Sequence, residues 1–124
     1  MIPSFLLPEQ VAREDGQGAV VALDGFTGKT VLLTLGINRV VEQESLDVSI
    51  QGSPDGEHWR TLAAFPQKFY CGTYSLLLDL AKDADVRQLR ARWKMGRWGR
   101  GDQKPLFGFY VFVDAAKVSL AGAA

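Results

Sequence analysis

The stretch 46–59 constrains the fold of this chain more than any other. Apolar and polar residues alternate over its first five positions, so an extended strand there buries one side and leaves the other in water. The sequence Ser-Pro-Asp-Gly at 53–56 then supplies turn chemistry, because the proline fixes its own φ and Gly56 tolerates a positive φ. Trp59 follows this turn. The pattern predicts a β-hairpin whose tryptophan packs back on the core.

Several further segments show the same two-residue alternation, and no long segment has a helical period. The clearest of them are 30–37, 74–80, 89–95 and 107–113. Turn-forming residues and short polar stretches separate these segments. Short strands at this spacing predict an all-β fold, an antiparallel β-sandwich that is jelly-roll-like, with seven to eight strands in two sheets.

The length and composition fit a single globular domain. With 124 residues the chain can bury about two-thirds of the surface that it exposes when unfolded. We predict an N-terminal arm at 1–18 with at most one short edge strand, a β-sandwich domain at 19–115, and a weakly structured tail at 116–124. The chain carries 14 basic and 14 acidic residues, and this balance argues against a dedicated nucleic-acid-binding protein.

The single cysteine and the distribution of apolar residues bear on location. Cys71 has no second cysteine to pair with, which excludes an internal disulfide and a cysteine-based zinc site. The apolar residues near the N-terminus are too few for a signal peptide, and no apolar run is long enough to span a membrane. We therefore expect a cytoplasmic or virion-associated protein that has no membrane partner.

A series of motifs along the chain points to a family. The motifs are Leu-Asp-Val-Ser-Ile at 46–50, Ser-Pro-Asp-Gly at 53–56, Trp59, Ala-Phe-Pro at 64–66, Leu-Arg-Ala-Arg-Trp at 89–93 and Phe-Gly-Phe at 107–109. In this order the chain resembles, over residues 19–115, small β-sandwich proteins encoded among bacteriophage structural genes and in prophage-like bacterial loci. The turn with its tryptophan is also similar to turns in carbohydrate-binding and discoidin-like sandwiches. The resemblance implies a virion or assembly role and brings no catalytic residues.

The residue pattern does not indicate a catalytic or metal site. His58 is the single histidine and lies beside Glu57 on the predicted turn, where side chains are usually solvated. Asp83 and Asp85 could hold a calcium ion at an edge of the sandwich, but acidic turn residues are usually only solvated, and the spacing of an EF-hand is absent. We therefore predict no enzyme activity, no cofactor and no metal.

The segment 87–104 holds half of the basic residues of the chain. The predicted partner-binding residues within it are Arg90, Arg92, Lys94, Arg97, Trp98 and Arg100. Trp93 falls on the apolar side of its strand and is assigned to the core. One interpretation of the basic residues is a solvated strand face, paired with acids on neighbouring strands, that forms a protein interface. The other is contact with nucleic acid, because arginine beside an exposed aromatic ring is typical of surfaces that bind single strands.

The last predicted strand is apolar on both sides. Phe107, Phe109, Val111 and Val113 occupy one face, and Tyr110 and Phe112 occupy the other. Because the outer side of a sandwich strand is normally polar, either the N-terminal arm or a second chain covers these two rings. We predict a homo-oligomer, or docking to a larger protein assembly, through Tyr110 and Phe112. The basic strand 89–95 is expected as their neighbour, with its arginines stacked on the rings at a subunit boundary.

These observations favour a non-enzymatic, phage-like structural or accessory protein that acts through protein–protein assembly. The alternative is a carbohydrate-binding module that uses Trp98 and Tyr110 as stacking platforms. A second alternative is an accessory protein that contacts nucleic acid through the basic loop 96–104.

Overall fold

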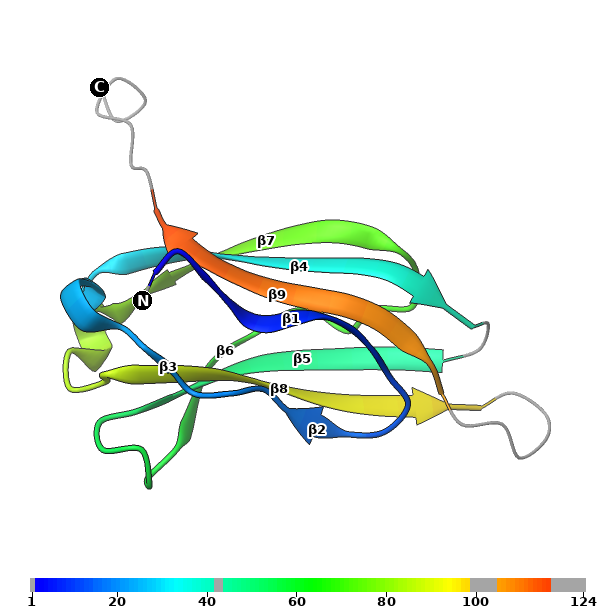
Figure 1. Ribbon diagram of the computed structural model, residues 1–124, viewed down its shortest axis with the longest axis horizontal. Coiled ribbons are helices and arrows are strands. Elements are labelled where there is room, and N and C mark those ends of the chain that lie inside the picture. The colour runs from blue at the N-terminus through cyan, green and yellow to red at the C-terminus, as the bar shows by residue number, and fades with distance from the viewer. Residues whose placement is uncertain (1, 42–43, 99–104, 117–124) are drawn as a thin grey trace, which may run out of the picture.

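The computed structural model describes residues 2–41, 44–98 and 105–116, which form two antiparallel β-sheets packed face to face (Figure 1). The strands are β1 (Ser4–Ala12), β2 (Gly16–Gln17), β3 (Val21–Ala22), β4 (Thr30–Val40), β5 (Glu44–Ser53), β6 (Arg60–Ala64), β7 (Gly72–Asp79), β8 (Gln88–Arg97) and β9 (Phe107–Ala115). Two 3-10 helices, η1 (Asp24–Phe26) and η2 (Leu80–Asp83), lie between strands. In this part of the chain, no helix has the length and apolarity needed to cross a membrane. The predicted all-β sandwich is confirmed.

The strand order is that of a jelly roll. One sheet, sheet A, has the order β1-β9-β4-β7, and the other, sheet B, has the order β2-β8-β5-β6 with β3 also paired to β8. Early and late strands of the chain therefore alternate in both sheets, as in the double Greek key of a jelly roll. The described residues form nine strands rather than seven or eight, because two separate two-residue strands, β2 and β3, run along β8.

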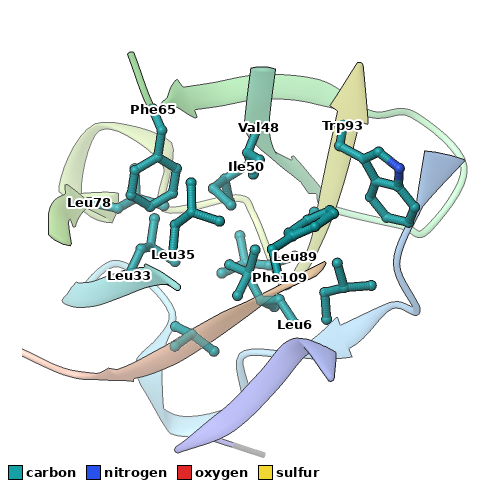
Figure 2. Packing of buried hydrophobic residues seen from close by; sticks show 14 of the residues in the cluster. Leu6, Leu33, Leu35, Val48, Ile50, Phe65, Leu78, Leu89, Trp93 and Phe109 are labelled. Carbon is teal, nitrogen blue, oxygen red and sulfur yellow. The ribbon is translucent and has the colours of Figure 1, made fainter. Parts of the chain in front are cut away.

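The space between the sheets is filled by the inward side of each alternating segment (Figure 2). Both predicted inward rows, that of β4 and that of β9, are buried: Val31, Leu33, Leu35, Ile37, Phe107, Phe109, Val111 and Val113. Trp93 enters the core from β8 and packs edge-on against Phe109, with ring centroids 5.6 Å apart. Its indole N–H donates to the carbonyl oxygen of Glu14 at 2.9 Å, so burial leaves that polar group satisfied.

The hairpin predicted at 46–59 forms between β5 and β6. Ser53 Oγ accepts hydrogen bonds from the backbone N–H groups of Asp55 (3.2 Å) and Gly56 (2.8 Å), and Gly56 adopts a φ of +82°. The prediction that Trp59 packs on the core is wrong. Its half-buried ring lies 4.1 Å from the guanidinium of Arg90, which points outward from sheet B, and cation–π attraction holds the pair there.

The N-terminal segment contributes more to the sandwich than the sequence predicts. In place of a short edge strand, β1 has nine residues and pairs with β9 along the edge of sheet A. Leu6 and Leu7 are both buried in the core. A register shift between Phe5 and Leu7 lets these consecutive leucines face inward, which a strict two-residue alternation cannot indicate. Most of the predicted tail, residues 117–124, lies outside the described residues.

Candidate functional site: the two outer faces

The outer side of sheet A carries an apolar surface. Tyr110 and Phe112 point to this side, as predicted, because their strand neighbours are buried in the core. The register places Phe5 of β1 beside Phe112, and Leu32 of β4 beside Leu77 of β7. These five residues, Phe5, Leu32, Leu77, Tyr110 and Phe112, are called the apolar face below.

Three rings of the apolar face pack against one another. Phe5 meets Phe112 edge-on with centroids 4.9 Å apart, and meets Tyr110 in the same way at 5.9 Å. Tyr110 and Phe112 are half-buried, whereas Phe5 is 46% exposed. With Glu9 and Thr34 the rings line an open hollow of about 380 Å³. The N-terminal strand therefore covers part of the two predicted rings, and the rest of the cluster faces outward.

Leu77 extends the apolar face to the free edge of sheet A. Its side chain is 63% exposed and lies opposite Leu32 across the β4–β7 pair. An aliphatic side chain in water forgoes stabilisation of roughly 25 cal/mol for each Å² left unburied. Leu77 is not among the predicted partner-binding residues, although the run Leu-Leu-Leu at 76–78 contains the signal: the middle residue must face opposite to its two inward-facing neighbours.

The basic residues of β8 lie on the opposite outer side of the molecule. Alternate residues of β8 are buried in the core, so Arg90, Arg92 and Lys94 point outward from sheet B. Within one chain this strand does not neighbour Tyr110 and Phe112, because β1 and β4 flank β9 in sheet A (Figure 1). The predicted partner-binding residues are thus divided between two faces.

Arg90 is engaged inside its own chain. Its Nε donates to Gln51 Oε1 at 2.7 Å, and its guanidinium lies over the ring of Trp59. Both partners come from the neighbouring hairpin, so Arg90 ties β8 to the turn region. This arrangement favours the interpretation of Arg90 as part of a paired strand face over its use as a phosphate contact.

Arg92 and Lys94 border a groove on the outer side of sheet B. In the β5–β8 register they lie opposite Ser49 and Asp47, so Lys94 has an acidic neighbour. The groove has a volume of about 320 Å³, and its other lining residues are Val48, Gln51, Thr61, Ala64, Phe65 and Trp93. It carries charged residues of both signs, in contrast to the apolar face.

Trp98 belongs to an exposed aromatic cluster just past the end of β8. Its ring is 59% exposed and packs edge-on against Phe69 at 5.9 Å, and Phe69 in turn lies 6.3 Å from Tyr70, which is 75% exposed. We call Phe69, Tyr70 and Trp98 the aromatic cluster. Trp98 and Tyr110 do not meet in the described residues, since one lies past the end of a sheet B strand and the other on the outer side of sheet A.

Two predicted partner-binding residues of this segment remain, Arg97 and Arg100. Arg97 is half-buried and lies opposite Glu44 in the β5–β8 register. Arg100 and most of the basic loop 96–104 lie outside the described residues, so their contribution to a binding face stays a prediction.

The single histidine lies on the exposed turn of the hairpin. Asp55 Oδ1 accepts the backbone N–H groups of His58 and Glu57, each at 2.9 Å, and Asp55 Oδ2 is 2.6 Å from His58 Nδ1. These hydrogen bonds stabilise the charged carboxylate and hold the pKa of Asp55 far below its usual range. The largest contribution comes from the backbone N–H of His58. In the described residues the hydrogen bonds of His58 run to Asp55 alone, so the group serves to close the turn.

The two acidic residues that were considered for calcium are paired with an arginine. Arg60 donates to Asp85 at 2.7 and 3.0 Å and to Asp83 at 3.0 Å. The hydrogen bonds from Arg60 lower the pKa of Asp85. The guanidinium of Arg60 therefore offsets the negative charge of these two carboxylates.

Comparison with known proteins bears on the fold. No protein-family model and no curated protein matches the chain. Among solved structures, the crystal structure of the SPBc2 prophage-derived protein YomS matches with a TM-score of 0.51 over 92% of this chain and 96% of that chain. The fold is similar to that of a prophage-derived protein. The sequence identity is 7%, so this likeness concerns the fold alone.

Proposed function

We propose that this protein is a non-enzymatic structural or accessory component of a phage-related assembly, and that it binds protein subunits through the apolar face. The proposal is supported by the resemblance of its motifs to phage-type sandwiches and by the fold that it shares with YomS. Jelly rolls also serve as capsid and lectin domains, so the fold permits assembly but does not dictate it.

The observation that carries the proposal is the composition of the apolar face. Two half-exposed aromatic rings, the exposed Phe5 and the exposed Leu77 occupy a side of a sheet that should be polar in an isolated sandwich. Exposed apolar side chains gathered on one face often mark protein interfaces. Aromatic side chains also contribute most to binding when they lie at the centre of an interface.

Sedimentation velocity over a range of protein concentrations tests the proposal, because it measures self-association through the apolar face. The wild type is expected to form species larger than 13.6 kDa through this face, and Phe5→Ser with Tyr110→Ser is expected to weaken that association. The matched control is Phe69→Ser with Tyr70→Ser, which removes one phenylalanine and one tyrosine from the aromatic cluster instead. Equal association of all three proteins, each with a wild-type circular dichroism spectrum, would contradict the proposal.

Carbohydrate binding is a second candidate, favoured by the position of the aromatic cluster. Lys68 precedes Phe69 and forms an isolated antiparallel β-bridge with Leu46. The residue after Leu46 is Asp47, which lines the groove on the outer side of sheet B. Aromatic rings beside hydroxyl, amide and carboxylate groups suit the faces and edges of sugar rings. Titration of a panel of neutral oligosaccharides should change the tryptophan fluorescence in the wild type and not in Trp98→Ala. A wild-type spectrum that stays constant across the panel counts against this candidate.

A further inference from the structure

Within the described residues, strand β7 is an outer edge of sheet A that lacks the usual protection against pairing. Figure 1 shows it as the outermost strand of sheet A, beyond β4. It is eight residues long, its register with β4 has no shift, and the segment 72–78 contains no proline and no charged residue. Long, flat, uncharged edges of this kind are templates for strand pairing, and most proteins disrupt them.

The other edges of this molecule are disrupted. On the far side of sheet A, β1 contains Pro8 and Glu9 and has two register shifts against β9. In sheet B, β2 and β3 have two residues each, and β6 has five residues, begins with Arg60, and pairs with β5 through a register shift. Of the sheet edges in the described residues, β7 is thus the one that lacks these features.

The backbone groups that β7 presents can be assigned from the ladder. The N–H of Leu80 donates to the carbonyl oxygen of Lys29 at 3.1 Å, one step beyond the register pair of Asp79 and Thr30. Hydrogen-bonded and non-hydrogen-bonded pairs alternate in an antiparallel ladder. The N–H and C=O groups of Thr73, Ser75 and Leu77 therefore point away from β4, and in the described residues no hydrogen bond reaches them.

We propose that β7 pairs antiparallel with β7 of a second copy of this chain, about a two-fold axis near Ser75, so that the two four-stranded sheets become one sheet of eight. An isologous contact of this kind uses the same segment twice, and the uncharged segment 72–78 brings no like charges together. The pairing satisfies the outward backbone groups of Thr73, Ser75 and Leu77 in both copies.

The pairing also gives Leu77 a neighbour from the second copy. With Ser75 of one copy opposite Ser75 of the other, Leu77 of each copy lies beside Thr73 of its partner on the outer side of the joined sheet. On this side the junction is lined by Thr73, Ser75 and Leu77 of both copies. This contact is separate from the docking proposed above, because it uses the edge of the sheet rather than the rings of Phe5, Tyr110 and Phe112.

The variant Ser75→Pro tests the pairing with little disturbance of the monomer. The N–H of Ser75 points away from β4, so proline removes no hydrogen bond within the chain, but it removes a donor from the free edge. In the Phe5→Ser, Tyr110→Ser background, which weakens association through the apolar face, sedimentation should give twice the chain mass of 13.6 kDa, and adding Ser75→Pro should give the single-chain mass with the same circular dichroism spectrum. Ser75→Ala, the matched control, should remain a dimer.

Two further measurements keep the proposal open to refutation. Hydrogen exchange should show the amides of Thr73 and Leu77 protected in the wild type and fast in Ser75→Pro. If Ser75→Pro does not fold, Ser75→Lys is used instead, because two lysines facing each other across the two-fold axis repel. A wild type that is monomeric at high concentration, or a folded edge variant that remains dimeric in the Phe5→Ser, Tyr110→Ser background, overturns the proposal.

The same experiment separates this proposal from the proposed function. Phe5→Ser with Tyr110→Ser should leave the β7 dimer intact. A dimer lost in Ser75→Pro and kept in that double variant supports edge pairing, even where docking through the apolar face fails. Association lost in the double variant and kept in Ser75→Pro supports the apolar face and refutes edge pairing.

Discussion

The ring of Tyr110 lies across Gly36, the residue opposite it in the β4–β9 pair. A Cβ built on Gly36 would overlap the ring atoms, so the glycine provides the space in which the ring packs on the outer side of the sheet. Glycine inside a strand weakens it, and an aromatic ring that covers the glycine offsets part of that loss. Gly36 thereby sets the position of one of the rings of the apolar face.

Replacement of Gly36 should show this dependence directly. Gly36→Ala is expected to lower the free energy of unfolding by about 1 kcal/mol, because overpacking against the ring costs more than the gain in strand propensity. In a Tyr110→Ala background the same replacement should be neutral or stabilising. Chemical denaturation of the four proteins gives the coupling energy, and additive effects would show that the ring does not depend on the glycine.

The turn of the central hairpin should be sensitive at Gly56. Its φ of +82° is unfavourable for residues with a Cβ, and a Cβ there would lie 2.9 Å from Gln88 Oε1. We expect Gly56→Ala to destabilise the protein by about 1–2 kcal/mol in thermal or chemical unfolding. Gly25→Ala is the control, because Gly25 has no positive φ and nothing near its Cβ position. Equal melting temperatures of the two variants would contradict the assigned turn geometry.

Local chemistry made much of the fold predictable. The two-residue period shows which side of a strand is buried, and it placed the inward rows of β4, β8 and β9 correctly. The turn at Gly56 follows from residue preferences within four positions. The period also placed Tyr110 and Phe112 on an outer side, which is half of the candidate site.

Pairing between distant segments was not predictable in the same way. Alternation does not say which sheet a strand joins, so it could not show that, within one chain, the basic strand β8 lies in sheet B and away from Tyr110. The burial of Glu44 was not predictable for the same reason, because this charged residue lies in a polar stretch of the sequence. Its carboxylate accepts the N–H groups of Val41 and of Leu106, 62 residues away, each at 2.8 Å. A buried carboxylate becomes tolerable only when the folded chain supplies such donors.

Acid should destabilise the protein in part through Asp55. The pKa of this carboxyl is held far below its usual range in the folded protein, whereas in the unfolded chain it is about 3.9. The unfolded state therefore binds the proton more tightly, so the stabilisation is complete above about pH 5 and is lost progressively as the pH falls. Melting temperatures between about pH 5 and pH 2 should decline less steeply in Asp55→Asn than in the wild type. Identical slopes for the wild type and Asp55→Asn would contradict the role of Asp55.

The nucleic-acid alternative can be tested on the outer side of sheet B. Arg90 is already bound to Gln51 and Trp59, and Lys94 faces Asp47, which leaves Arg92 as the least engaged cation of the strand. Phosphate binding depends on several free cations and weakens steeply with salt as condensed counterions are released. We therefore expect no binding at physiological salt: addition of the protein should not raise the fluorescence anisotropy of a labelled single-stranded oligonucleotide.

The result that would reverse this expectation is specific. Binding at low salt that falls steeply as salt rises, and that disappears in Arg92→Glu with Lys94→Glu, would favour contact with nucleic acid through the basic side chains of β8. The matched control is Arg13→Glu with Lys29→Glu, which makes the same change in net charge outside that strand. If both double variants lose binding equally, the effect comes from net charge and not from this face.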